Sequence, residues 1–506
     1  MSQVRERHAR FYLDDCRARP GDWVWFETEW PQIQRAWLWV SAARQEDELL
    51  IAYVRAVLPF QAQRDLWHEV VVWAERALPI VRARAAQADE LFMLAHLARA
   101  RYELGQVRRA LDLHGQCLTL ALTLADPAAA CAAWGGQASA SLHLGEARQA
   151  RDYFQQQLAL ARAHGLRAAE ASALRGLGAA HFDLGEFGAA GPVYAESLAL
   201  YEALGDQRNA GAVFGNMGNA RAVLGDLATA VDLYRRALAL AQETGDHSLE
   251  ALTLSNLGIA HKNLGQARTA VELHEQALSL HRQTGNRQGE SLACCNLGIA
   301  HKDLGDYAAA LAFTQRYQQL AREIGNRRSE GSALGNLAEI YCLSGEFAAA
   351  HMHIEQSLAI ARAIGNRYGE TNALLHLGAA LAGLGQPEAA DQAYRAALTL
   401  AVEIGHRAGQ AQALVRLGQA CAARHADQAA LDYYGQAQVV AQALGNQRLE
   451  AEIAWELGEL YAGLGQTKAA LTWLQKRVDY ERTVGHAQAE AHAERVAALR
   501  GAAPPA

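Results

Sequence analysis

The sequence predicts an all-α protein, a right-handed α-solenoid superhelix built from antiparallel helix pairs. Three observations predict it: an internal repeat of 40 residues, two glycine positions in each repeat, and apolar residues three or four positions apart between the glycines. A chain of 506 residues exceeds the usual size of one compact core, so it forms several domains or one extended array. The unbroken repeat favours the array.

Two glycine series, offset by 20 residues, divide each repeat into two helices. In the first series glycine follows leucine, at Gly105, Gly145, Gly185, Gly225, Gly265, Gly305, Gly385 and Gly465. The second series is Gly165, Gly205, Gly245, Gly285, Gly325, Gly365, Gly405, Gly445 and Gly485. Such a glycine suits the left-handed position that ends a helix, and the Asn or Asp that often follows the second series can cap the next helix. Each repeat is therefore predicted to be helix, turn, helix, turn.

A small residue also recurs in the middle of the first helix of the repeat. The positions are Gly178, Gly218, Gly258, Gly298, Ala338, Gly378, Gly418 and Gly458. Glycine inside a helix costs about 1 kcal/mol relative to alanine, so its recurrence requires a packing reason. Twelve residues later an alanine recurs, as in Ala230 and Ala270. We expect these small residues to face each other and let the two helices approach closely.

The segment Ser255 to Glu290 resembles a tetratricopeptide repeat of the long kind, with a period of roughly 40 residues. The matching positions are Leu257, Gly258, His261, Gly265, Ala270, His274 and Ala277. Repeats of this kind occur in the Pins and LGN spindle-orientation adaptors and in the repeat regions of bacterial STAND-type regulators. The second helix is longer here than in the common 34-residue repeat. The resemblance implies a scaffold that binds a protein or an extended peptide along a concave groove.

The repeat pattern divides the chain into three parts. Residues 1–47 are predicted to be an aromatic-rich N-terminal helical cap, residues 48–487 about eleven helix pairs, and residues 488–506 a C-terminal capping helix with a frayed tail. Pro31 is predicted to begin a helix that runs to about Ala43. Pro192 lies early in a second helix, where it marks either a hinge or a tolerated imperfection. His425 stands where a glycine is expected.

Composition excludes several classes of function. The formal charge of -7 provides no basic surface for nucleic acid, and no long apolar run could span a membrane. Seven scattered cysteines without CxxC spacing indicate buried thiols in a reducing compartment, so we expect a cytoplasmic protein. No nucleophile with a base, paired acids or metal ligands converge in the pattern. We therefore expect a non-enzyme without cofactor or metal.

The candidate binding residues lie on the first helices, whose exposed side chains line the groove in proteins of the resembled family. Asn216, Asn256, Asn296 and Asn336 occupy one repeat position in successive repeats, and Asn219, Lys262, Lys302, Glu339 and Arg416 lie around this row. An amide both donates and accepts hydrogen bonds, so the row could hold the main chain of a peptide. Alternatively, each amide bonds to the neighbouring repeat and sets the stacking register. Both alternatives are open at this point.

The favoured function is a non-catalytic interaction scaffold with a protein or peptide in the groove. The alternative is a ligand- or peptide-responsive sensor, a regulatory module of a bacterial signalling system. The two differ in one observable, because only a sensor changes its shape when the peptide binds.

Overall fold

The computed structural model describes residues 2–42, 47–64, 66–484, 486 and 488–501. Over these residues it contains 25 helices and no strand, which confirms the predicted all-α class. The chain divides into two compact units, unit 1 from Met1 to Asp206 and unit 2 from Gln207 to Ala506. The repeat pattern did not predict this division, since the 40-residue spacing continues across it.

Unit 1 contains α1 (Ser2–Ala18), α2 (Trp23–Ala42), α3 (Asp47–Gln63), α4 (Trp67–Ala83), α5 (Gln87–Glu103), α6 (Val107–Thr123), α7 (Pro127–His143), α8 (Ala147–Ala163), α9 (Arg167–Asp183) and α10 (Phe187–Ala203). Unit 2 begins with α11 (Gln207–Val223), α12 (Leu227–Thr244), α13 (His247–Asn263), α14 (Ala267–Gln283), α15 (Arg287–Asp303), α16 (Tyr307–Ile324), α17 (Arg327–Leu343) and α18 (Phe347–Ala363). It continues with α19 (Arg367–Gly383), α20 (Pro387–Glu403), α21 (Arg407–Ala423), α22 (Asp427–Leu444), α23 (Gln447–Gly463), α24 (Thr467–Val484) and α25 (Ala489–Gly501).

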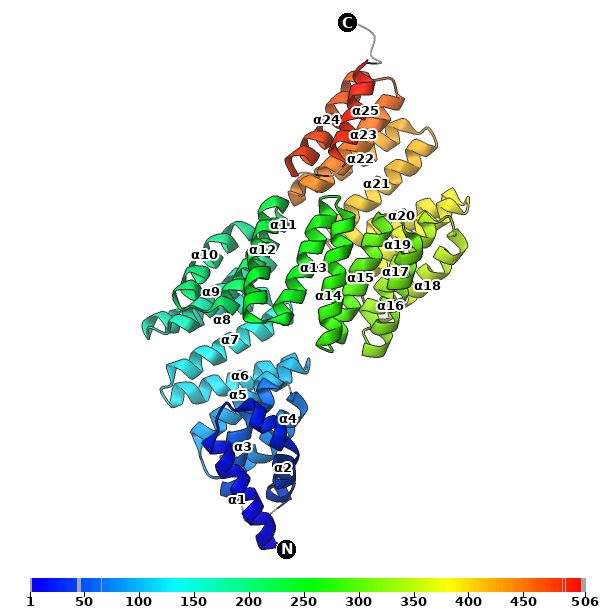
Figure 1. Cartoon of the computed structure of the whole chain (residues 1–506). Helices are drawn as coiled ribbons and strands as arrows, with labels where there is room; N and C mark the ends of the chain where they lie inside the picture. The colour runs from blue at the N-terminus through cyan, green and yellow to red at the C-terminus, as the bar shows by residue number, and fades with distance from the viewer. Residues whose placement is uncertain (1, 43–46, 65, 485, 487, 502–506) are drawn as a thin grey trace. The chain divides into compact units, whose positions relative to one another are not determined.

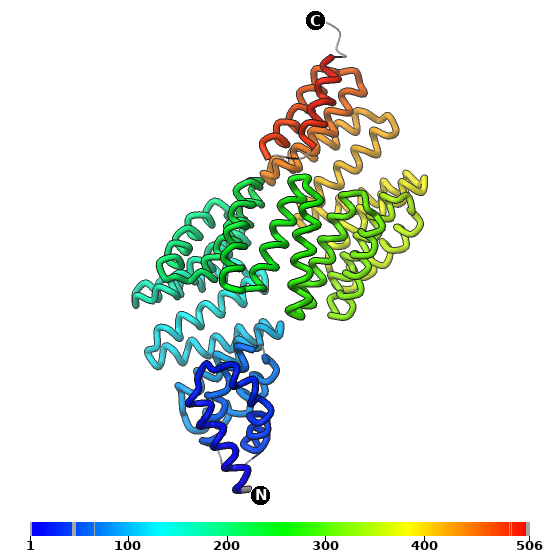
Figure 2. The backbone as a smooth tube through the Cα atoms, in the orientation of Figure 1, coloured from blue at the N-terminus to red at the C-terminus, as the bar shows by residue number. Residues whose placement is uncertain are grey.

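From α3 onward, odd-numbered helices are the first helices of the repeats and even-numbered helices up to α24 are the second. Each helix packs against the one before it and the one after it within its unit, as Figures 1 and 2 show. This arrangement confirms the predicted α-solenoid of antiparallel helix pairs.

The turns between helices use the predicted residues. Gly245 ends α12 with a φ of +65°, and the side chain of Asp246 accepts a hydrogen bond from the Leu249 backbone over 3.0 Å. Four asparagines cap their helices in the same way, namely Asn286, Asn326, Asn366 and Asn446. His425 adopts a φ of +58° in place of the expected glycine, so the turn keeps its shape despite the substitution.

The recurring mid-helix glycines also make room for a side chain that the pattern did not predict. A Cβ on Gly218 would come within 2.5 Å of Cε1 of Tyr234, and one on Gly258 would come within 2.5 Å of the His274 ring. The alanines twelve residues on, such as Ala230, are fully buried. The glycine therefore receives the large side chain sixteen residues later, while the alanine keeps the helices close enough for that contact.

Aromatic side chains of α2 pack against the first helix pair of unit 1. Phe26 stacks on Phe60 with ring centroids 4.9 Å apart, and Trp37 stacks on Trp73 at 4.1 Å. The prediction for Pro31 is wrong, because α2 begins at Trp23 and runs through the proline. Packing on α3 and α4 outweighs the backbone hydrogen bond that proline removes.

Two further expectations concern the irregular helix and the end of the chain. The helix α10 runs through Pro192 without interruption, and the boundary between the units follows this helix. At the other end, Val496 of α25 packs on Leu474 and Val478 of α24. Gly485 and the tail residues 502–506 lie outside the described residues.

All seven cysteines are free thiols in buried or half-buried positions. Across the part of the chain that the structure describes, no helix combines the length and apolar character needed to cross a membrane.

Candidate functional site

First helices of unit 2 surround a hollow of about 920 Å³. Its lining comes mainly from α17, α19, α21 and α23, and includes Asn336, Glu339, Phe347, Asn372, His376, Arg416, Gln419, Glu452 and Glu456. A second hollow of about 130 Å³ lies between α17, α18 and α19. The two hollows share Asn336, Asn372 and His376, and we call them together the unit 2 groove.

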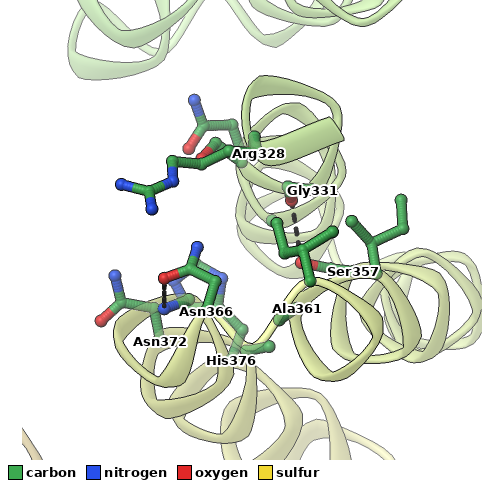
Figure 3. A pocket seen from close by; sticks show the side chains of 14 residues that line it. Arg328, Gly331, Ser357, Ala361, Asn366, Asn372 and His376 are labelled. Carbon is green, nitrogen blue, oxygen red and sulfur yellow. Dashed lines mark hydrogen bonds between the residues drawn. The ribbon is translucent and has the colours of Figure 1, made fainter. Parts of the chain in front are cut away.

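The smaller hollow owes its space to glycines on α17. Gly331 and Gly335 face it, and the Gly331 carbonyl accepts a hydrogen bond from Ser357 over 2.8 Å. Figure 3 shows Arg328, Asn366, Asn372 and His376 among the side chains that line this space. Asn366 is engaged as the cap of α19, where its side chain accepts from the Gly369 backbone over 3.1 Å.

Three predicted residues, Asn336, Glu339 and Arg416, line the groove. Lys302, also predicted, donates to Glu339 over 2.8 Å. Burial is the largest single influence and raises the pKa of the Glu339 carboxyl, but the charge of Lys302, its hydrogen bond and the effects of His376 and Arg416 together outweigh burial and leave the pKa below its ordinary value. The pair is therefore ionised and bridges two successive first helices at neutral pH.

The other predicted residues do not line the groove. Asn256 donates from Nδ2 to Oδ1 of Asn219 over 3.2 Å, and the same oxygen accepts from the Tyr234 hydroxyl over 2.7 Å. Asn216 is half-buried. Lys262 is half-buried too, and burial lowers its pKa, an effect that the charge of Asp303 opposes.

Two asparagines of the amide row form bonds to a neighbouring repeat, as expected if the row sets the stacking register. Asn256 bonds to the preceding repeat through Asn219, and Asn336 donates to the Cys295 sulfur over 3.7 Å. Asn296 differs, since its Nδ2 atom is buried and has no hydrogen-bond partner among the described residues. Register contacts thus use two of the amides, and a role of the row in partner binding stays a prediction.

Sequence reasoning missed His376, although a signal was present. The position of the amide row continues every 40 residues beyond Asn336 as His376, Arg416 and Glu456. All three line the groove. Burial lowers the pKa of His376, so its imidazole is uncharged at neutral pH. The row therefore passes from amides to charged groups along unit 2.

The charged groups at the far end of the groove are satisfied internally. Glu452 accepts from Arg448 over 2.9 Å, and Glu456 accepts from Gln419 over 3.2 Å. Arg416 donates to Gln419 over 3.1 Å. Because these groups already have partners, the groove presents mixed polarity without a strong field of one sign.

A contact between distant repeats lies beside the groove. Arg448 of α23 donates to Asn263 of α13 over 2.8 Å, and a Cβ on Gly265 would come within 2.9 Å of the His486 ring. Val484 packs against the apolar cluster that contains Leu227. We call this set of contacts the clasp. It joins the first two helix pairs of unit 2 to the last one.

A series of ion pairs between successive helices was also not predicted from the sequence. An Arg at the end of a second helix bonds to a Glu eight residues later, in the first turn of the next helix. The pairs are Arg82–Glu90, Arg162–Glu170, Arg282–Glu290, Arg322–Glu330, Arg362–Glu370 and Arg482–Glu490, at 2.6 to 3.3 Å. The 40-residue period of both residue types was the signal that could have found it.

No group of three or more His, Cys, Asp or Glu that could hold a metal ion occurs within the described residues. Two of the recurring histidines form side-chain contacts inside their own turn. His181 lies 2.6 Å from Glu186, and His261 lies 2.6 Å from Gln266.

Comparison with protein families decides the identity of the repeat. Three models described as tetratricopeptide repeat match the chain, one at residues 209–283 and 290–363, one at 93–128 and one at 371–401. These segments of the chain match the tetratricopeptide repeat. No curated protein matches its sequence. The matched segments include the residues of α17 and α19 that line the larger hollow, whereas those of α21 and α23 lie outside them.

Solved structures with the same fold include two Rap proteins. The apo form of RapI has a TM-score of 0.55 and 12% identity, over 70% of this chain and 97% of that chain. A Rap protein complexed with Competence and Sporulation Factor has a TM-score of 0.52 and 14% identity, over 71% and 100% of the two chains. At these identities the likeness shows a shared fold alone.

A STAND protein with a tetratricopeptide repeat sensor, PH0952 from Pyrococcus horikoshii, is also similar. Its TM-score is 0.47 with 16% identity, over 73% of this chain and 55% of that chain.

Proposed function

We propose that the unit 2 groove binds an extended segment of a protein or peptide, and that the chain is a non-catalytic interaction scaffold. The observation that carries the proposal is the continuity of the two hollows through Asn336, Asn372 and His376. Amides and an uncharged imidazole present donors and acceptors together, which suits the main chain of a peptide better than a single charged ligand.

Asn372 is the most direct probe of this proposal. Its side chain is exposed, lines both hollows, and has no hydrogen-bond partner among the described residues. Replacing it therefore removes groove contacts without breaking an internal bond. Asn336 is less suitable, because its amide also bonds to Cys295 and its loss would disturb the stacking.

The experiment selects binders from a random-peptide display library against the immobilised full chain. Peptides that bind the wild type are then titrated against the double variant Asn372→Ala with Arg416→Ala, and also against Asn372→Ala alone, because Arg416 donates a hydrogen bond to Gln419. We expect the double variant to bind about tenfold or more weakly, since hydrogen bonds to neutral and charged groups are worth about 1–3 kcal/mol.

The control is Gln392→Ala, an exposed amide on the second helix α20, which should bind as the wild type does. Equal binding by the wild type and the double variant, with helicity unchanged, would contradict a role for the groove.

The clasp favours a second candidate function, a peptide-responsive regulatory module. Few contacts hold the ends of unit 2 together, so a ligand that binds only the open form could separate them. Adding a selected peptide would then increase hydrogen exchange at the clasp. Unchanged exchange with the peptide bound would favour the rigid scaffold.

A further inference from the structure

Unit 1 has a hollow of its own, of about 660 Å³, between α5, α6 and α7. This volume lies in the usual range of ligand pockets. Its walls include Leu91, Phe92, Ala95, Ala132, Ala133 and Gly136. The wall is mostly apolar, whereas amides and charged groups line the unit 2 groove. We call this space the unit 1 hollow.

Small residues of α7 border the hollow and leave its space open. Gly136 occupies the repeat position of Asn216 and Asn256, and Ala132 occupies that of Asn372. The ring of His114 from α6 lies in the space next to this glycine, where a Cβ would come within 2.3 Å of its Cε1 atom. Filling the glycine position is thus incompatible with the present packing.

His114 belongs to the apolar wall despite its polar ring. Burial lowers the pKa of His114 to about 4, so the imidazole is uncharged at neutral pH. Leu124, at the edge of the hollow, remains 37% exposed. A concave apolar wall of this size loses unfavourable contact with water when an apolar group enters it.

The charged residues at the rim of the unit 1 hollow indicate which polar group of a ligand should accompany its apolar group. Arg99 lies over the Trp67 ring at 5.2 Å, and no carboxylate of the described residues lies within ion-pair distance of it. Arg55 lies over Phe92 at 5.5 Å but is already paired with Asp89. Asp126 caps α7 by accepting from the Ala129 backbone over 2.9 Å.

Arg99 therefore offers guanidinium N–H groups to a carboxylate. Stacking on a ring occupies the face of a guanidinium and leaves the N–H donors at its edge available. An apolar wall beside an unmatched cation is complementary to a bulky apolar group that has a carboxylate next to it.

We propose that the unit 1 hollow binds a peptide segment of a partner protein, with a bulky apolar side chain in the hollow and a neighbouring carboxylate on Arg99. This site is separate from the unit 2 groove and does not depend on its function. It would anchor a partner by a side chain, whereas the groove would hold main chain.

The test uses the full chain and two blocked peptides, one of sequence Asp-Phe-Leu-Asp and one of sequence Asn-Phe-Leu-Asn, titrated by ligand-observed NMR. We expect the acidic peptide to bind about tenfold more tightly, as a charge-assisted hydrogen bond allows. Arg99→Gln should abolish this preference. Ala132→Trp should fill the hollow and abolish binding of both peptides.

Two matched control variants distinguish effects at the unit 1 hollow from effects of the same substitutions elsewhere on the surface. Arg148→Gln makes the same charge change at an exposed position of α8, and Ala128→Trp adds the same bulk at an exposed position of α7 outside the lining. Both should bind as the wild type does. Equal affinity for the two peptides, no binding of either, or full binding by Ala132→Trp would overturn the proposal. So would hydrocinnamate binding as tightly as the acidic peptide, because a small apolar acid would then suffice.

Discussion

Arg448 on α23 donates a hydrogen bond to Asn263 on α13 over 2.8 Å, although 185 residues separate them in the chain. The contact lies at the edge of unit 2, beside the packing of Val484 against the Leu227 cluster. Contacts between neighbouring repeats dominate the rest of the array. The clasp can therefore be weakened by a single substitution without disturbing a helix pair.

Loss of the clasp should loosen its two sides. Asn263→Ala removes the acceptor and leaves Arg448 paired with Glu452. Because a hydrogen bond to a charged donor is worth about 1.5–3 kcal/mol, we expect hydrogen exchange at residues 262–266 and 480–484 to rise about tenfold. Exchange measured by mass spectrometry checks this, with Gln392→Ala as the control. Identical exchange in Asn263→Ala and wild type would show that the contact contributes nothing in solution.

Two glycines of α11 should respond to alanine with opposite signs. Gly218 receives the Tyr234 ring, so Gly218→Ala should lower the free energy of unfolding by about 1–3 kcal/mol through overpacking. No heavy atom lies within 4 Å of a Cβ placed on Gly215, so Gly215→Ala should raise it by up to about 1 kcal/mol through helix propensity. Urea denaturation measures both. A loss of stability in Gly215→Ala similar to that in Gly218→Ala would refute this account.

His274 should make unit 2 less stable as the pH falls. The side chain is 1% exposed, and burial, followed by the charge of Lys262, lowers its pKa to about 4. Between about pH 6.5 and pH 4 the unfolded chain takes up a proton that the folded chain does not, so stability decreases by up to about 1.4 kcal/mol per pH unit. Above this window both states are neutral and the effect disappears.

The repeat itself supplies the variant that tests this. Tyr234 and Tyr394 occupy the position of His274, so His274→Tyr should fold and remove the titration. Between pH 7 and pH 5 the variant should lose about 2 kcal/mol less stability than the wild type. His164→Tyr, at an exposed position, should behave like the wild type. If the free energy of unfolding changed equally with pH in the wild type and in His274→Tyr, the loss of stability could not be due to His274.

Replacing a non-glycine residue that has a left-handed backbone conformation with glycine should increase stability. Ala125 has a φ of +53° in the turn between α6 and α7, where a Cβ costs about 1–2 kcal/mol. Ala125→Gly should therefore raise the thermal midpoint. The free energy of unfolding should increase by about 1 kcal/mol, because the larger conformational entropy of glycine in the unfolded chain offsets part of the strain that is relieved. The reverse change, Gly165→Ala at a φ of +65°, should lower it. A lower midpoint in Ala125→Gly would show that the turn is not strained.

The helices and their turns could be predicted because their causes are local. A glycine such as Gly245 ends a helix and Asp246 caps the next one, and each needs only a few neighbouring residues to act. The candidate site could be predicted in part, since Asn336 and Arg416 occupy one repeat position, Glu339 lies three residues after Asn336, and all three line one hollow. His376 was missed because its position was read as an amide row and not as a position occupied by several polar residue types.

What the sequence alone determined is the repeating helix pair and the side chains that each first helix offers, because both follow from periodic local pattern. Tertiary structure decided that Asn256 bonds to Asn219, that Arg448 reaches Asn263, and that small residues of α7 leave an apolar hollow open. The physical reason is geometric. Each repeat adds a small rotation and shift to the last, and their sum, which no single repeat encodes, sets which distant side chains meet and which spaces stay empty.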